Sequence, residues 1–291
     1  MKGFPIYISI LFLLAMSSCS KSQNENSEST ETSPLPAKVI TAGGTITETL
    51  YALGVSDLII ATDRTSTFPA EMQALPSIGY RNQIKAEGIL SLGADLVLIE
   101  EGYLNEEVVT QLKSSGQAIE IILKPSSVEE TKQVITKLGD LFDLEDKAAN
   151  LNKQIDQDLA DLNAYLETSE SQPSAAFVMA RGPETLFIAG EKTFAESMFE
   201  LAGITSVASG FEEFVPLTPE SLVSINPDYL VFFDSGIQSL GDKNGLANVQ
   251  GIKETKAFQE DHIISMDGHY LSSFGPRVGQ AALELAKAVR E

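Results

Sequence analysis

The chain has 291 residues, of which 43% are hydrophobic, so it can bury the core of one large domain or of two lobes. Its 41 acidic and 20 basic residues give a net charge of −21, which argues against nucleic acid or an anionic surface as a partner. The single cysteine, Cys19, excludes an intramolecular disulfide.

Residues 1–18 are typical of a secretory signal peptide. One lysine and a short apolar run precede small residues, and the run is too short to span a membrane. Cys19 follows directly, as in a bacterial lipoprotein signal, in which this cysteine carries the lipid. Residues 19–36 are mostly polar and predict a disordered tether. We expect an exported lipoprotein, anchored to a membrane in the periplasm or at the cell surface. The alternative is a secreted protein that loses Cys19 with its signal.

A parallel α/β sheet is predicted for residues 37–143, where short apolar strands alternate with helices. The expected strands are residues 38–41, 58–61, 95–99 and 118–123. The expected helices are residues 45–54, 85–92, 106–115 and 128–142.

Residues 144–170 are expected to form a long helix between two lobes. Leu or Ile recurs at helical spacing over about 24 residues without Gly or Pro, which predicts a length of about 36 Å. Strands and helices alternate again in residues 171–291. We therefore predict an α/β protein with two Rossmann-like lobes joined by one rigid helix. In the second lobe we expect strands at 174–180, 185–190, 228–234 and 262–266, helices at 193–203, 217–225 and 276–290, and a polar loop at 235–248.

The second lobe repeats two segments of the first lobe in the same order, which indicates duplication. The matching segments are residues 45–54 with 193–203, and residues 84–100 with 217–233. The aligned acidic residues are Glu48 with Glu196, Glu87 with Glu220, and Asp95 with Asp228. The loop between the two segments is about 15 residues longer in the first lobe, and these extra residues fall in the loop that contains Tyr80.

Tyr80 lies in a Gly-containing loop, where it is displayed rather than packed, and we expect it to face a ligand. Four of the five arginines also lie in predicted loops, where guanidinium groups suit the capture of carboxylate or phosphate. These four are Arg64, Arg81, Arg181 and Arg277. Ligands of such sheets bind at the carboxyl ends of the strands, so we expect a cleft between the lobes that these side chains line.

From Lys38 to its end, the chain resembles the substrate-binding proteins of ABC importers. The resemblance is to the class in which a single long helix links the lobes and whose ligands include haem, cobalamin and ferric siderophores. The segments AGGTITETLYALG, IGYRNQIKAEGILSL and FGPRVG resemble its haem-binding branch. The resemblance implies that the protein captures haem b as Fe(III) cargo in the inter-lobe cleft. It would then deliver the haem to a permease and ATPase complex, and we expect the binding protein to be a monomer.

The resemblance also implies that Tyr80 is the axial ligand of the haem iron. A phenolate is a hard oxygen donor, and it suits Fe(III). Five residues are candidates to bind the haem propionates or to act as partners of the phenol: Arg81, Arg181, Arg277, Arg64 and His269. His269 is also a minor candidate for a second iron ligand, whereas His262 is expected to be structural.

Glu87 and Glu220 are the positions that match the two glutamates with which this class docks on permease arginines. The alternative for both is stabilisation of the first turn of a helix, which favours acidic side chains.

An enzyme is not expected. The chain has no phosphate loop, no HExxH and no GxSxG, and AGGT is too short for a dinucleotide fingerprint. A ferric siderophore is the alternative cargo, and cobalamin is a further one. Cobalamin binders of this class generally line the cleft with tryptophan, and this chain has none.

Overall fold

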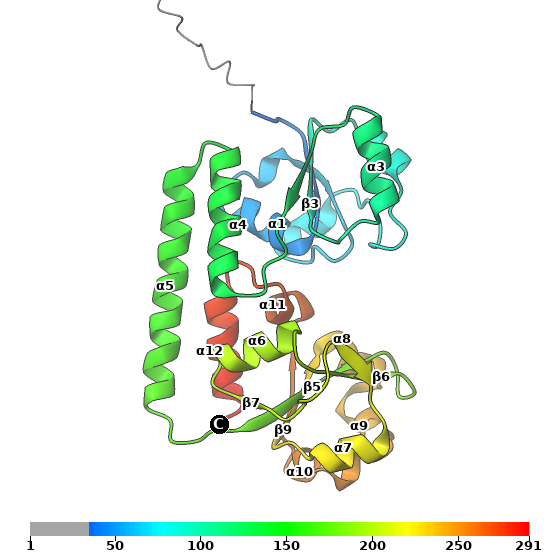
Figure 1. Ribbon diagram of the computed structural model, residues 1–291, viewed down its shortest axis with the longest axis vertical. Coiled ribbons are helices and arrows are strands. Elements are labelled where there is room, and N and C mark those ends of the chain that lie inside the picture. The colour runs from blue at the N-terminus through cyan, green and yellow to red at the C-terminus, as the bar shows by residue number, and fades with distance from the viewer. Residues whose placement is uncertain (1–34, 291) are drawn as a thin grey trace, which may run out of the picture. The chain divides into compact units, whose positions relative to one another are not determined.

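The computed structural model describes residues 35 to 290. The predicted signal peptide, Cys19 and nearly all of the predicted tether therefore lie outside the described residues. Among the helices of the described part, none has both the length and the apolar character that a membrane span requires. The described residues contain two sheets, one in each half of the chain, as predicted (Figure 1).

The first half contains a four-stranded parallel sheet with the order β2-β1-β3-β4, which confirms the predicted class. Its strands are β1 (Val39–Ala42), β2 (Ile59–Thr62), β3 (Leu96–Glu100) and β4 (Ile119–Ile122). Its α-helices are α1 (Gly44–Ala52), α2 (Ala86–Leu90), α3 (Glu106–Ser114) and α4 (Val128–Leu141). Two short 3-10 turns, η1 (Ser56–Leu58) and η2 (Ala70–Ala74), lie in the connections.

Alternate side chains of each strand enter different apolar clusters, because successive residues of a strand point to opposite faces. Val39 and Leu98 pack on the face that α1 and α4 cover. Ile40, Val97 and Ile99 pack on the other face, against α2 and α3. The continuous apolar runs in the sequence are therefore explained by a sheet with helices on both faces.

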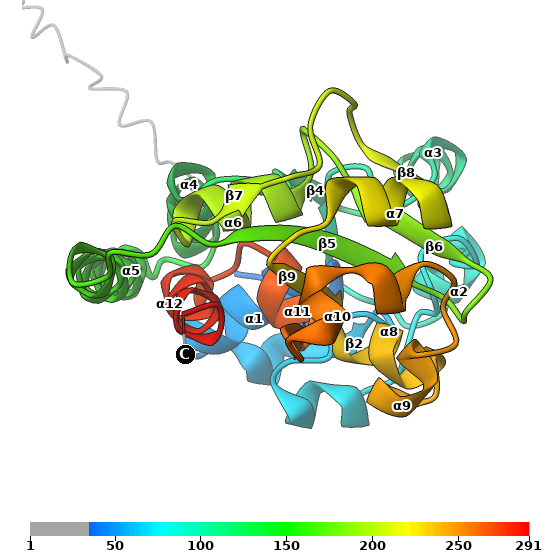
Figure 2. The same cartoon turned by 90° about the horizontal axis from the view of Figure 1, so that it is seen from below.

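The second half contains a sheet with the order β10-β9-β5-β6-β8, and β7 also pairs with β5. Strands β7, β9 and β10 run parallel to their neighbours, whereas β6 and β8 are antiparallel, which the sequence did not predict. Its strands are β5 (Ser174–Ala180), β6 (Leu186–Ala189), β7 (Thr205–Ser206), β8 (Phe214–Pro216), β9 (Tyr229–Phe233) and β10 (Ile263–Met266). Figure 2 shows this sheet from below, with β5 crossing it.

The helices of the second half include two where a polar loop was predicted. Residues 235–248 contain most of α8 and all of α9, so the loop prediction is wrong; Ile237 and Leu246 supply buried apolar side chains there. The helices are α6 (Phe194–Leu201), α7 (Pro219–Ile225), α8 (Asp234–Ser239), α9 (Asp242–Leu246), α10 (Lys256–Gln259), α11 (Gly268–Ser272) and α12 (Val278–Ala288), with the 3-10 turn η3 (Ile252–Glu254).

Helix α5 (Glu145–Glu167) has 23 residues and lies where the linking helix was predicted. It packs against α4 beside one end and α12 beside the other, both on the same side of α5, so the three helices form a layer (Figures 1 and 2). The contact with α12 is close, because a Cβ atom on Gly279 would lie 2.7 Å from the Cβ of Asp158. The linking helix is therefore supported along its length by its neighbours.

One apolar cluster is shared by the two halves. It contains Val39 of β1, Ile155 and Leu162 of α5, and Phe177 of β5 and Val231 of β9. Each sheet also has its own cluster on its other face. Because the halves share a core, the described residues form one compact unit. The proposed boundaries within it, 37–143, 144–170 and 171–291, remain predictions.

The predicted duplication is visible in two equivalent carboxylates. Asp95 accepts hydrogen bonds from the amides of Ala37 (3.0 Å) and Lys38 (2.9 Å), just before β1. Asp228 accepts hydrogen bonds from the amide (3.0 Å) and hydroxyl (2.6 Å) of Ser174, at the start of β5. Each carboxylate thus fastens the first strand of its half.

We expect Asp228→Asn to lower the free energy of unfolding by about 1 kcal/mol at pH 7, because charge-assisted hydrogen bonds contribute ~1.5–3 kcal/mol and this side chain is partly exposed. Hydrogen bonds from Lys256 and Ser174 lower the pKa of Asp228 to about 2. The stabilisation is present above the unfolded-state pKa of about 3.9 and is lost as the pH falls towards 2. Urea unfolding at several pH values measures this.

Asp161→Asn is the control, since Asp161 is an exposed residue of α5. A difference between wild type and Asp228→Asn that stays constant from pH 7 to pH 2.5 would contradict the assignment.

Candidate functional site

The loop that carries Tyr80 runs beside the carboxyl end of β2. The amide of Ile78 donates to the carbonyl oxygen of Thr62 (2.9 Å), and the amide of Arg64 donates to that of Gly79 (3.0 Å). The chain then turns sharply, and the side chain of Tyr80 is 39% exposed. The loop is thus anchored to the sheet while its tyrosine is displayed, as predicted from the sequence.

Arg81 is directed towards the loop that follows β3. Its Nη2 donates to the carbonyl oxygen of Gly102 (3.0 Å). Its guanidinium carbon lies 5.4 Å from the centre of the Tyr103 ring, within the range of a cation–π interaction. A place for Arg81 beside the ligand stays a prediction, and in the structure its side chain holds a neighbouring loop of the protein.

Asp63 lies beneath this contact and is 3% exposed. It accepts hydrogen bonds from the amides of Gly43 (2.9 Å) and Thr65 (2.7 Å) and from the hydroxyls of Ser66 (2.6 Å) and Tyr103. Burial raises the pKa of the Tyr103 phenol, and the charge of Asp63 raises it further, so the phenol stays protonated and donates. Sequence reasoning did not identify Tyr103 or Asp63, although a polar residue directly after a strand was an available signal for Asp63.

Glu48 of α1 joins the two halves. It is 2% exposed and accepts hydrogen bonds from Arg277 Nε (2.6 Å) and Nη2 (3.2 Å) and forms one with His269 Nε2 (2.7 Å). Burial alone would raise the pKa of Glu48, but the hydrogen bonds and charges of His269 and Arg277 outweigh it, and the net shift is downward. His269 and Arg277 are therefore engaged by the protein at the junction of the halves.

The long loop of the first half also reaches this junction. The guanidinium carbon of Arg277 lies 3.5 Å from the ring centre of Phe68 and 4.7 Å from that of Tyr270. In addition, the hydroxyl of Thr45 donates to the carbonyl oxygen of Ser273 (2.9 Å). The carboxyl ends of both sheets therefore meet, as expected for a ligand site in this type of fold.

Gly44 permits this close approach, and its neighbour Gly43 permits close packing within the first half. A Cβ atom on Gly44 would lie 2.6 Å from Cε1 of His269, and one on Gly43 would lie 2.6 Å from the Cβ of Glu100. Gly43 also has a φ of +134°, which side-chain-bearing residues rarely adopt. Gly44 is therefore explained by packing across the junction, and Gly43 by its positive φ and its contact with β3 of the same half.

The remaining candidates lie on the surface. Arg64 follows β2 and Arg181 follows β5, and both are exposed. Glu87 and Glu220 are exposed in the first turns of the equivalent helices α2 and α7. Neither glutamate serves as a side-chain cap, because α2 has none and the capping box of α7 is made by other residues. Helix capping therefore does not explain the glutamates, although the helix dipole still favours them.

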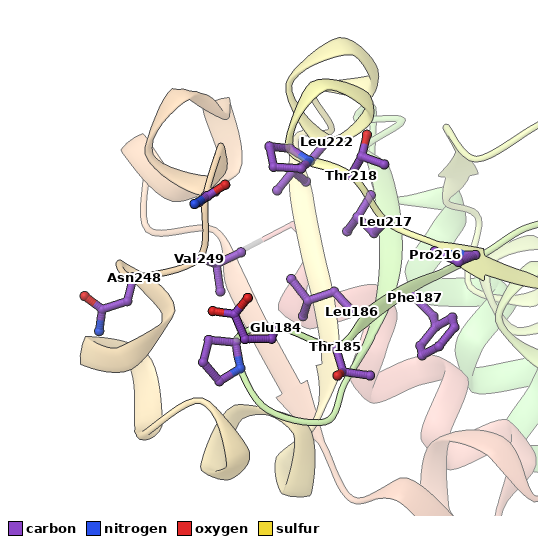
Figure 3. Close-up of a pocket in the computed structure, with 13 residues that line it drawn as sticks. Glu184, Thr185, Leu186, Phe187, Pro216, Leu217, Thr218, Leu222, Asn248 and Val249 are labelled. Carbon is purple, nitrogen blue, oxygen red and sulfur yellow. The ribbon is translucent and has the colours of Figure 1, made fainter.

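A cavity of about 280 Å³ lies in the second half, beside the start of α7 (Figure 3). Its apolar floor contains Leu186, Leu217, Leu222 and Val249. None of the predicted site residues lines it. The cavity is therefore distinct from the site predicted for haem.

Two α/β halves that meet at the carboxyl ends of their strands, beside a long connecting helix, define a two-lobed binding protein. The family model for periplasmic binding proteins matches residues 39–270, and the chain belongs to this family. Proteins of this family bind solutes for transport, so the class predicted from the sequence is confirmed.

Solved structures of haem-binding proteins are similar to the chain. The periplasmic heme-binding protein RhuT from Roseiflexus sp. RS-1, in the apo form, is 31% identical with a TM-score of 0.83, and the match covers 87% of this chain and 97% of that chain. The periplasmic heme-binding protein BhuT in complex with two hemes is 29% identical with a TM-score of 0.82, with the same two coverages.

Curated relatives are more distant. An ABC transporter substrate-binding lipoprotein of Bacillus subtilis (strain 168), YvrC, is 26% identical over 257 residues, which are 87% of this chain and 80% of that protein. A vitamin B12-binding protein of Vibrio parahaemolyticus is 24% identical over 251 residues, 86% of this chain and 88% of that protein.

We expect Gly44→Ala to lower the free energy of unfolding by about 1–3 kcal/mol, because the added methyl group overlaps His269 in a packed junction. The matched control is Gly88→Ala in α2, where no atom lies within 4 Å of the new Cβ and a gain of up to about 1 kcal/mol is expected. Denaturant unfolding of both variants measures the two effects. Equal stability of Gly44→Ala and wild type would show that the junction is looser than described.

Proposed function

We propose that this protein captures Fe(III) haem through the phenolate of Tyr80 and delivers it to the permease and ATPase complex of an ABC importer. The observation that carries the proposal is an exposed tyrosine on a loop anchored to the carboxyl end of a parallel sheet. The similarity to RhuT and BhuT supports haem as the cargo. A phenolate oxygen stabilises ferric iron, so the site would hold oxidised haem.

The other polar residues of the proposed site divide into two groups. Arg64 and Arg181 are exposed, and we assign them to the haem propionates, which guanidinium groups bind in a bidentate manner. Arg81, Arg277 and His269 already bond to Gly102 or Glu48. Contact of these three with haem would require them to share or exchange those partners.

We also propose that the chain is exported as a monomer and anchored by a lipid on Cys19. The arrangement of an apolar run, small residues and cysteine supports this, and the Bacillus subtilis relative is itself named a lipoprotein.

Titration of the apo-protein with hemin should give a high-spin ferric spectrum with a charge-transfer band. Tyr80→Phe removes the oxygen ligand and should weaken binding by at least about tenfold, with loss of that band. The control is Tyr51→Phe, since Tyr51 is another exposed tyrosine of the first half, at 41%. An unchanged spectrum and affinity in Tyr80→Phe would refute haem binding through this residue.

Cobalamin is the second candidate cargo, because a vitamin B12-binding protein is among the relatives. A ferric siderophore is the third. The same absorbance titration with cobalamin and with a ferric siderophore separates the three, since only haem uses the Tyr80 phenolate in this proposal.

Glu87 and Glu220 are proposed to dock on arginines of the permease. The double variant Glu87→Lys/Glu220→Lys should abolish uptake while hemin affinity stays within about twofold of wild type, because reversed charges repel the permease. The control is Glu107→Lys/Glu200→Lys, which reverses one exposed helical glutamate in each half. Uptake at the wild-type rate by the first double variant would rule out docking through these glutamates.

A further inference from the structure

The turn that contains Tyr80 is tied to the rest of the first half by Arg81. Residues 80–83 are all exposed, and the amide of Gln83 donates to the carbonyl oxygen of Tyr80 (2.7 Å) to close the turn. Before the turn, residues 76–79 pair with the end of β2; after it, Ile84 is buried in the cluster beneath α2. The side chain of Arg81 fastens the exposed part between these two anchors.

Tyr103 provides the surface on which Arg81 rests. Its ring lies beneath the guanidinium group, 5.4 Å from centre to carbon, and the residue is 8% exposed. Its hydroxyl donates to Asp63 and lies 2.8 Å from the hydroxyl of Thr65. Asp63 is held by the amide of Gly43, so the ring is fixed to the ends of β1 and β2.

We propose that Tyr103 is a positioning residue, which holds Arg81 and thereby fixes the orientation of the Tyr80 phenol for its ligand. The inference rests on the proposed function of Tyr80 as an iron ligand. It assigns Arg81 to the presentation of the ligand instead of to a haem propionate. Tyr103 acts through Arg81 and does not itself bind the iron.

The chemistry of the contacts suits this role. A guanidinium group that stacks on an aromatic ring and donates to a carbonyl oxygen at the same time is restrained in both tilt and position. Burial raises the pKa of Tyr103, so its hydroxyl remains a donor to Asp63 throughout the physiological range. Metal affinity depends on the orientation of each ligand, and loss of an orienting group typically weakens binding 10–100-fold.

The test compares Tyr103→Leu, Tyr103→Phe and the control Tyr229→Leu in the full chain. Tyr103→Leu removes the stacked ring, and we expect hemin affinity to fall about tenfold and the ferric charge-transfer band to broaden as the phenol samples several orientations. Tyr103→Phe keeps the ring and should restore most of the affinity and the band shape. Tyr229 stacks on His262 in the second half, so Tyr229→Leu removes a comparable stacked ring without affecting the spectrum.

Hydrogen exchange of the apo-protein tests the inference without haem. Tyr103→Leu should speed exchange of the Gln83 amide by about tenfold or more, with little change in the amides of the second half. If Tyr80→Phe leaves hemin binding intact, the proposed function fails, and the exchange result still decides whether Tyr103 restrains the turn. Unchanged exchange at Gln83 in folded Tyr103→Leu would overturn the inference.

Arg81→Met gives a second route in case Tyr103→Leu does not fold, because Arg81 lies on the surface. It should reproduce the loss of affinity and the faster exchange. In the double variant Arg81→Met/Tyr103→Leu the two losses should not multiply, because both residues act through one contact. Losses that multiply would show that Arg81 contacts the haem independently, and this would overturn the assignment.

Discussion

The buried carboxylate of Glu48 is the interaction on which the junction of the two halves depends. A carboxylate at 2% exposure is stable only if its charge is matched, and both of its charged or hydrogen-bonding partners, Arg277 and His269, come from the other half. These three residues lie beside an apolar cluster that both halves share. These two features hold the carboxyl ends of the sheets together and oppose large relative movement of the halves, and Gly44 after β1 leaves room for the contact.

Comparison of the halves shows which parts of the duplicated unit were kept and which changed. Asp95 and Asp228 have the same role, since each fastens the first strand of its half. Glu48 and Glu196 have different roles. Glu196 accepts a hydrogen bond from the amide of Lys192 within its own half, whereas Glu48 accepts hydrogen bonds from Arg277 across the junction. The first half alone has the long loop with Tyr80. In the proposed function, the first half therefore presents the iron ligand, and the second half contributes Arg181.

Much of the fold follows from local sequence patterns, and most of the site contacts do not. The alternation of apolar strands and helices predicted both sheets, and the uninterrupted helical pattern at 144–170 predicted α5 to within a few residues. The helices at 235–248 were missed because most of their residues are polar or glycine, and only a few apolar side chains, such as Ile237 and Leu246, are buried. Arg277 was placed in a loop, but its partner lies 229 residues away, and sequence spacing gives no information about such contacts. Tyr103 carried no local signal, because its role comes from its contact with a loop about 20 residues earlier.

The order in which the chain is synthesised gives the Glu48 contact a further meaning. Its two partners are translated 221 and 229 residues after it, and Thr45 and Thr131 of the first half likewise bond to the carbonyl oxygens of Ser273 and Phe274. A nascent chain that stops short of these residues can form the strands of the first sheet but leaves a carboxylate there without its countercharge. In such a chain that carboxylate has to stay hydrated, because burial of an unpaired charge is costly, so the packing around Glu48 depends on residues from the end of the chain.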